Sequence, residues 1–230
     1  MNEWSENFLK FCKQEPALTL VLVGDTRSRE NIRTLQEHGW GRMFATKVPT
    51  PYPGEPTGFD NGAFDAWQKG TEFPEELFLR RLSEAEKVVV PRVAVVPDLV
   101  ARGLESLEFS WNWFGARREL PVEWPWYLAV QDGMTLADVR GVIRGGWAGL
   151  FLGGTNGFKQ QTAWQWVELA HEFGLKFHYG RAGTLKKLRH AKQIGADSLD
   201  SNLPLWTKER FRTFIAEYFD DSQASLALTH

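Results

Sequence analysis

Cysteine is nearly absent from the sequence, since Cys12 is the single one in 230 residues. One cysteine excludes an internal disulfide and a zinc site built from several cysteines. The chain has no run of about 18 apolar residues, and residues 1–15 lack the basic start and apolar middle of a secretory signal. We therefore expect a cytoplasmic protein without a membrane partner.

An excess of charge of either sign is missing too. The 27 Lys and Arg residues nearly balance 29 Asp and Glu residues, which gives a formal net charge of -2. A domain that binds nucleic acid usually shows a strongly basic balance or a basic tail. Any such contact must therefore use a local basic stretch. The candidates are residues 79–81, 158–161 and 180–192, and each of them is also typical of a solvated helix face.

Aromatic residues, in contrast, are abundant, and 11 of them are Trp. We expect most of these indoles in the core, with a few available as stacking platforms for bases.

Apolar runs alternate with amphipathic segments along the chain, separated by Gly and Pro. Eight apolar runs predict strands, at 18–24, 41–47, 59–64 (a brief strand or a strand end), 93–98, 126–132, 148–154, 176–180 and 197–201. Strands without polar alternation, nearly all separated by helices, are typical of a parallel sheet covered on both faces. The pattern predicts an α/β protein, a compact (β/α)8 barrel forming one domain over 1–219 with a loose tail at 220–230. A doubly wound open sheet is the alternative.

Polar residues gather where the predicted strands end: Asp60, Asp98, Gln131, His178 and Asp200. In a barrel, the carboxyl ends of the strands share one mouth. Two or three carboxylates there suit acid–base or nucleophilic chemistry at a sugar carbon. Capping of the next helix or turn is the alternative for the first two acids. Metal binding is a weaker alternative, because no paired His ligands occur, and we expect neither a metal nor a cofactor.

Five short motifs resemble, in the same order, those of the tRNA-guanine transglycosylase superfamily. They read FDNGAF at 59–64, VVPD at 95–98, AVQDG at 129–133, GLFLGGT at 149–155 and YGRAGTLKKLRHAKQIGADSLDS at 179–201. They look closest to the DNA deazaguanine transglycosylases of phages and bacterial genomic islands, the DpdA group, over about residues 20–206. The resemblance implies a barrel enzyme, a pentosyltransferase that exchanges guanine in DNA for a 7-deazaguanine base of the preQ0 type. It also implies the host cytoplasm as the location if a phage encodes the chain.

The resemblance further implies a role for each matched residue. Asp200 would be the nucleophile that attacks C1′ and expels guanine, and Asp60 would carry a proton between the departing and incoming bases. The residues expected to contact the base are Asp98, Gln131, Gly149 and Leu150 through their backbone, Gly153, and Phe64 by stacking. Lys159 and Arg181 lie one loop beyond predicted strand ends, Lys159 before a helix predicted to start at residue 162, and each is expected to contact the nucleic-acid backbone or to form a surface salt bridge. His178 is expected to pack in the core, with contact to the sugar as the alternative. Asp197 is expected to anchor a turn.

The sequence departs from the tRNA enzymes where they carry a zinc site of three cysteines and a histidine, because residues 201–211 here read SNLPLWTKERF. The loss of that site and its insertion favours DNA over tRNA as the substrate. Gly154 stands where the fourth motif ends in Glu, which leaves the accepted deazaguanine open. The target guanine must be flipped out or single-stranded to reach such a pocket, with or without helper proteins. Three alternatives remain: a tRNA substrate, hydrolytic release of the base, and a non-catalytic barrel that binds nucleic acid.

Overall fold

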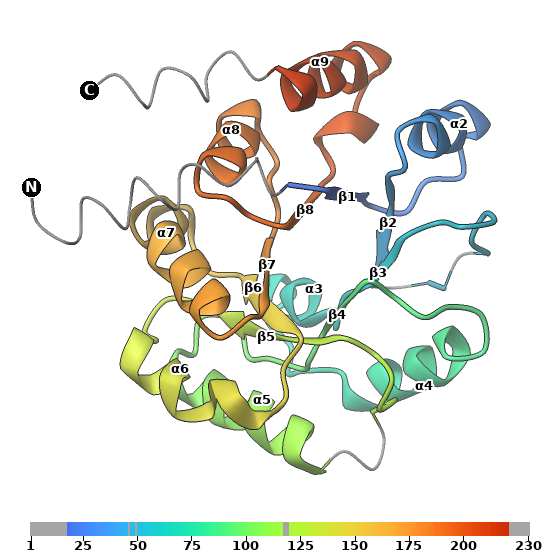
Figure 1. Cartoon of the computed structure of the whole chain (residues 1–230). Coiled ribbons are helices and arrows are strands. Elements are labelled where there is room, and N and C mark those ends of the chain that lie inside the picture. Colours follow the sequence, from blue (N-terminus) through green and yellow to red (C-terminus); the bar gives the residue numbers. More distant parts are fainter. Residues whose placement is uncertain (1–17, 46, 49, 117–119, 221–230) are drawn as a thin grey trace, which may run out of the picture.

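The computed structural model describes residues 18–220 except 46, 49 and 117–119. Parallel strands close into a barrel in chain order, which confirms the predicted (β/α)8 fold (Figure 1). The open sheet is excluded because β1 pairs with both β2 and β8. The strands are β1 (Leu20–Val23), β2 (Gly41–Phe44), β3 (Thr57–Phe59), β4 (Val93–Val95), β5 (Trp126–Val130), β6 (Gly149–Leu152), β7 (Lys176–Tyr179) and β8 (Ser198–Ser201).

Helices surround this barrel, except the short α3, which lies over one end of it in Figure 1. Several helices begin at a Ser or Thr whose side chain accepts a backbone N–H of the first turn. The helices are α2 (Arg29–Glu37), α3 (Ala63–Gln68), α4 (Glu75–Ala85), α5 (Leu104–Ala116), α6 (Leu136–Val142), α7 (Asn156–Glu172), α8 (Leu185–Gln193) and α9 (Lys208–Phe219), with 3-10 turns η1 (Ile143–Gly145) and η2 (Leu203–Leu205). Within the described ranges, no helix combines the length and the apolar character needed to cross a membrane.

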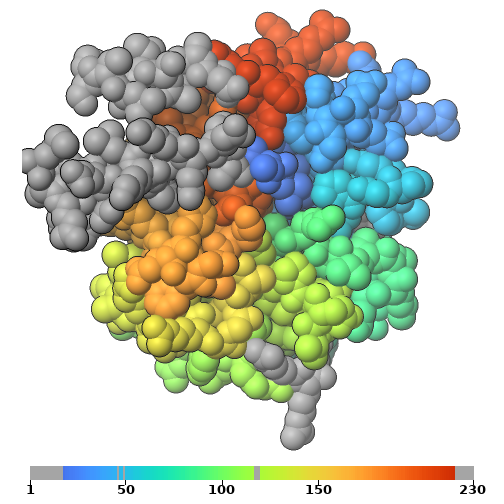
Figure 2. Space-filling view, in the orientation of Figure 1, coloured from blue at the N-terminus to red at the C-terminus, as the bar shows by residue number. Residues whose placement is uncertain are grey.

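The two ends of the described chain meet where the barrel closes. Figure 2 shows the sequence colours running once around the molecule, so that α2 and α9 lie side by side. Lys208 on α9 pairs with Glu30 on α2 at 2.6 Å. Register confirms the closure, because Leu22 of β1 lies opposite Asp200 of β8.

Two elements differ from the sequence-based prediction. The third strand is Thr57–Phe59, which ends where we expected it to begin, and the short helix α3 follows at once. Gly62 precedes α3 with φ of +78°, a left-handed conformation that a strand does not use. Helix α7 starts at Asn156, earlier than the predicted 162, because Thr155 caps it through the N–H of Phe158. That earlier start changes the position of Lys159.

Side chains along each strand alternate between the barrel interior and the layer under the helices. One cluster fills the interior and contains Leu22, Met43, Val93, Val95, Tyr127 and Ala129. The larger cluster packs strands against helices and includes Leu150, Phe177, Tyr179 and Leu199. Because Phe177, Tyr179 and Leu199 face the helices, the alternate positions His178 and Asp200 face the interior.

The connection from β2 to β3 contains no helix in its described residues, and an ion pair packs there instead. Arg42 donates from Nε and Nη2 to the Glu55 carboxylate at 2.7 and 2.8 Å. It also donates to the carbonyls of Thr26 and Thr50, and both charged side chains are buried. This bidentate contact is a strong form of charged hydrogen bond, and it holds the loop against β2.

Candidate active site

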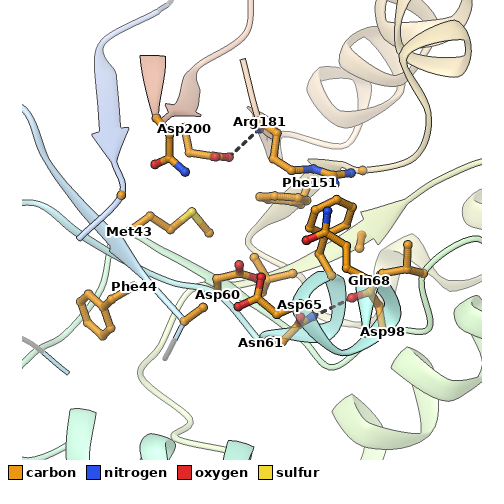
Figure 3. Close-up of a pocket in the computed structure, with 18 of the residues that line it drawn as sticks. Met43, Phe44, Asp60, Asn61, Asp65, Gln68, Asp98, Phe151, Arg181 and Asp200 are labelled. Carbon is orange, nitrogen blue, oxygen red and sulfur yellow. Dashed lines mark hydrogen bonds between the residues drawn. The ribbon is translucent and has the colours of Figure 1, made fainter. Parts of the chain in front are cut away.

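A cavity of about 400 Å³ opens among the residues that follow the strands at their carboxyl ends. This volume lies within the range of small-molecule sites. Five acids line it, namely Asp25, Asp60, Asp65, Asp98 and Asp200. Figure 3 shows Asp60 and Asp200 reaching toward one space from opposite sides. The two residues that the sequence placed at a shared mouth therefore do face the same cavity.

Asp200 lines the cavity and uses one carboxylate oxygen for hydrogen bonds to the protein. Its Oδ1 accepts hydrogen bonds from His178 Nε2 at 3.1 Å and from the Arg181 backbone N–H at 2.9 Å. No hydrogen bond to Oδ2 is found among the described residues. Burial acts to raise the pKa of Asp200, but the His178 bond and charge, the Arg181 N–H and the Lys159 charge together lower it. Asp200 is therefore an ionised carboxylate with a free oxygen.

His178 is fully buried beneath Asp200, with 0% of its surface exposed. Its Nδ1 lies 2.8 Å from the Ser198 hydroxyl, and its ring stacks on Phe151 with centroids 4.9 Å apart. With the Ser198 hydroxyl donating to Nδ1, the ring donates from Nε2 to the carboxylate. The prediction that His178 contacts nucleic acid is thus wrong, because the side chain is packed inside the barrel, which was its other expected role.

The pKa of Asp60 is shifted upward, whereas that of Asp200 is shifted downward. Burial, followed by the negative charges of Asp200 and Asp98, raises its pKa to about 7. The N–H of Gly62 donates to its Oδ1 at 3.4 Å, which acts in the other direction but more weakly. Asp60 does not cap α3, because the N-cap residue of that helix is Gly62 and no side chain bonds there. A carboxyl with a pKa near neutrality can both donate and accept a proton.

Asp98 lies in a polar cluster under the same cavity. Asn61 Nδ2 donates to Asp98 Oδ1 at 2.7 Å, and Gln131 Nε2 donates to Oδ2 at 3.3 Å (Figure 3 shows the first bond). Burial raises the pKa of Asp98 to about 6, against the effect of these two amides and of Arg181. Gln131 also bonds Ser106 and the backbone of the loop after β4. Gln131 therefore holds Asp98 in place, and its direct contact with a base stays a prediction.

Arg181 crosses the mouth of the cavity. Its φ of +54° is left-handed, an uncommon and strained conformation for a residue with a side chain. That backbone points the N–H at Asp200, while the guanidinium lies 3.8 Å from the centroid of the Phe64 ring and Nη2 donates to Gly154. Phe64 in turn stacks on Trp67. The expected site residues Arg181 and Phe64 are thus both at the cavity and in contact with each other.

The expected positions of three residues are corrected. Gly149 begins β6, where it pairs with Lys176 at the amino end of the strand, away from the cavity. Leu150 is buried under the helices, so neither residue lines the cavity, whereas Gly153 does. Lys159 is 1% exposed inside α7, donates to the Gly180 carbonyl and does not reach the surface. Burial, with the Arg181 charge, lowers the pKa of Lys159 well below its ordinary value.

Gly154 has a structural reason to lack a side chain. Its φ is +75°, and a Cβ there would lie 2.5 Å from Asp132 Oδ2. That Asp132 carboxylate accepts the Thr155 N–H and hydroxyl, both at 2.7 Å, and so fixes the start of α7. A glutamate at position 154 would require this turn to change.

Asp197 lies at the other end of β8 from the cavity and has the anchoring contacts that we expected. It accepts bonds from His171, from Lys176 and from the N–H of Phe177, each at 2.8 Å. Burial acts to raise its pKa, but these donors lower it on balance.

Several lining residues were missed by the sequence reasoning: Asp25, Met43, Asn61 and Asn202. Asn61 follows Asp60 directly in the FDNGAF motif, so its place in that motif could have identified it as a cavity residue. Asp25 and Asn202 each follow a strand end, at β1 and β8. Among the described residues, no group of three His, Cys, Asp or Glu side chains is arranged to hold a metal ion.

Fold and cavity together define a (β/α)8-barrel protein with an acidic pocket at the carboxyl ends of its strands. No protein-family model matches the chain, and no curated protein matches it either.

Proposed function

We propose that this protein exchanges guanine in DNA for a 7-deazaguanine base, through a covalent bond between Asp200 and the deoxyribose. The observation that carries the proposal is that two carboxyls on one cavity have pKa values shifted in opposite directions. Asp200 is ionised, whereas the pKa of Asp60 is raised to about 7. Paired groups whose environments push their pKa values apart are typical of a nucleophile and a general acid.

In the first half-reaction, Asp200 Oδ2 attacks C1′ of the target nucleotide. The bond from C1′ to the base breaks, its electron pair leaves with guanine, and the proton of Asp60 neutralises the departing base. Asp200 becomes an ester of the sugar, and Asp60 becomes a carboxylate. Oδ1 keeps its bonds to His178 and Arg181 throughout, because it is the carbonyl oxygen of that ester.

The second half-reaction reverses these roles. Asp60 takes the ring N–H proton of the incoming 7-deazaguanine, and the nitrogen attacks C1′. The bond from C1′ to Oδ2 breaks, and its electron pair returns to Asp200. Two successive displacements retain the configuration at C1′, and the donors to Oδ1 stabilise the carboxylate as it leaves. We assign to Asp98 the bond to the polar edge of either base, and Gln131 and Asn61 hold its carboxylate in position.

The direct test uses DNA labelled in its guanine bases, single-stranded and duplex, with tRNA in parallel. We expect label loss from single-stranded DNA that depends on added preQ0 or a related base, with the modified base recovered in the strand. Guanine release without an incoming base would instead identify a hydrolytic glycosidase, and label loss from tRNA alone would identify a tRNA enzyme. An absence of reaction with every substrate would reject the catalytic proposal.

His178 provides a second prediction. In His178→Leu, Asp200 loses a hydrogen bond worth about 1.5–3 kcal/mol to a charged group, so the rate of exchange should fall about 10- to 100-fold. The same loss raises the pKa of Asp200, so the activity should disappear at a higher pH on the acid side. His178→Gln places an amide N–H near the same position and should restore part of both. An unchanged pH–rate profile in His178→Leu would contradict this role.

A further inference from the structure

A second hollow, of about 650 Å³, lies on the same face of the barrel as the cavity. It is bounded by the loops that follow β7 and β8 and by the beginnings of α8 and α9. Its lining includes Gly183, Leu185, Leu203, Trp206 and Arg210. In (β/α)8 barrels, the loops after the seventh and eighth strands often bind part of the substrate.

The hollow adjoins the cavity along two stretches of chain. Asn202 lines the cavity and Leu203 lines the hollow, while Arg181 lines the cavity and Gly183 lines the hollow. Two residues of extended chain span at most about 7 Å. A polymeric substrate whose target nucleotide sits in the cavity therefore passes directly over the hollow if its strand leaves on this side.

Trp206 gives the hollow a flat apolar surface. The residue is 59% exposed, although Trp is usually well buried. The Arg210 guanidinium lies 4.6 Å from the centroid of its ring. Among the described residues, no ion pair joins Arg210 to an acid, so its charge is available to a ligand. Glu209 also lines the hollow, and its carboxylate makes stacking, rather than net positive charge, the main attraction.

We propose that Trp206 and Arg210 bind the unpaired nucleotide next to the target guanine, with its base stacked on the indole and the guanidinium close to its phosphate. The inference rests on the proposed function, because only a nucleic-acid substrate continues from the cavity into the hollow. An exposed aromatic ring beside a cation is the usual platform for an unpaired base. Stacking tolerates any base, so this contact holds the strand without reading its sequence.

The test compares substrates that reach the hollow with one that does not. Trp206→Ala should raise the KM for a single-stranded oligonucleotide with one central guanine by about tenfold or more. It should leave kcat and the kinetics on a deoxyguanosine mononucleotide unchanged. Trp206→Phe should recover most of the affinity. The matched control is Trp164→Ala, since Trp164 is 47% exposed on α7 and lines neither the cavity nor the hollow.

Binding is measured separately by fluorescence anisotropy, with an oligonucleotide that lacks guanine and so cannot react. The dissociation constant should rise in Trp206→Ala and stay unchanged in Trp164→Ala. Equal constants for the two variants and the wild-type protein would overturn the inference, as would a change of oligomeric state in Trp206→Ala, which would assign the surface to a second copy of the chain. If the wild-type protein binds this strand through Trp206 but exchanges no base, the proposed function fails and the binding site stands.

Discussion

Asp200→Asn is expected to lower the rate of base exchange by a factor on the order of 10⁴ or more, while the barrel stays folded. The asparagine carbonyl oxygen can still accept the bonds that His178 and Arg181 donate, but an amide has no anionic oxygen to attack C1′. The loss should therefore appear in the rate and not in the free energy of unfolding. Both quantities are measurable on the same preparation, by single-turnover exchange and by urea denaturation.

Asp197→Asn is the matched control, because it changes the same residue type three positions earlier in the chain, away from the cavity. Asp197 accepts bonds from His171 and Lys176 at the far end of β8. Its neutralisation should cost about 1–3 kcal/mol of stability and leave exchange by the folded protein intact. Equal exchange rates in Asp200→Asn and the wild-type protein would remove Asp200 from the chemistry.

Asp60→Asn is expected to slow exchange by about 10²- to 10⁴-fold, the usual contribution of a general acid or base. The direction in which the rate changes with pH follows from the raised pKa of Asp60. Burial and the charges of Asp200 and Asp98 raise the pKa of Asp60 to about 7, so its acid form is present below that pH and is lost as the pH rises through it. The first half-reaction needs the acid form. Its single-turnover rate in the wild-type protein should thus fall above a pH of about 7.

Asp65→Asn serves as the comparison, since Asp65 lines the same cavity from α3. It removes one negative charge without removing a reacting carboxyl. Since the Asp65 charge contributes to the raised pKa of Asp60, the alkaline limb should move slightly to lower pH, with the maximal rate little changed. A wild-type rate that stays constant from neutral to alkaline pH, or an active Asp60→Asn enzyme, would contradict the assignment.

The fold and the meeting of Asp60 and Asp200 at one cavity could be predicted because each depends on local sequence. Apolar runs separated by amphipathic helices indicate a parallel barrel, and a polar residue at the end of such a run is expected near the shared mouth. Asp60 and Asp200 both follow from that rule. Asp197 was assigned to the turn because it precedes the position that the final motif matches, and the structure places it at the other end of the strand.

Other residues could not be placed from hydrophobic periodicity, because their positions depend on helix capping, on where they lie along a strand and on strand register. Lys159 was expected on a loop, but Thr155 caps α7 early and carries the lysine into the helix, where it is buried. Gly149 and Leu150 lie in the correct strand but in its first half, and their expected base contact came from the motif resemblance, which does not place a residue along a strand. His178 lies under Asp200 only because β7 and β8 pair with His178 opposite Ser198, a register that no local pattern shows.

The most direct test of the account is to map the covalent intermediate. The wild-type protein is incubated with a guanine-containing single strand without an incoming base, denatured in acid, digested and analysed by mass spectrometry. We expect a deoxyribose-linked strand on the peptide that contains Asp200, and none in Asp200→Asn. A strand attached to another residue, or guanine released by the wild-type protein and by Asp200→Asn alike with no attachment, would contradict it.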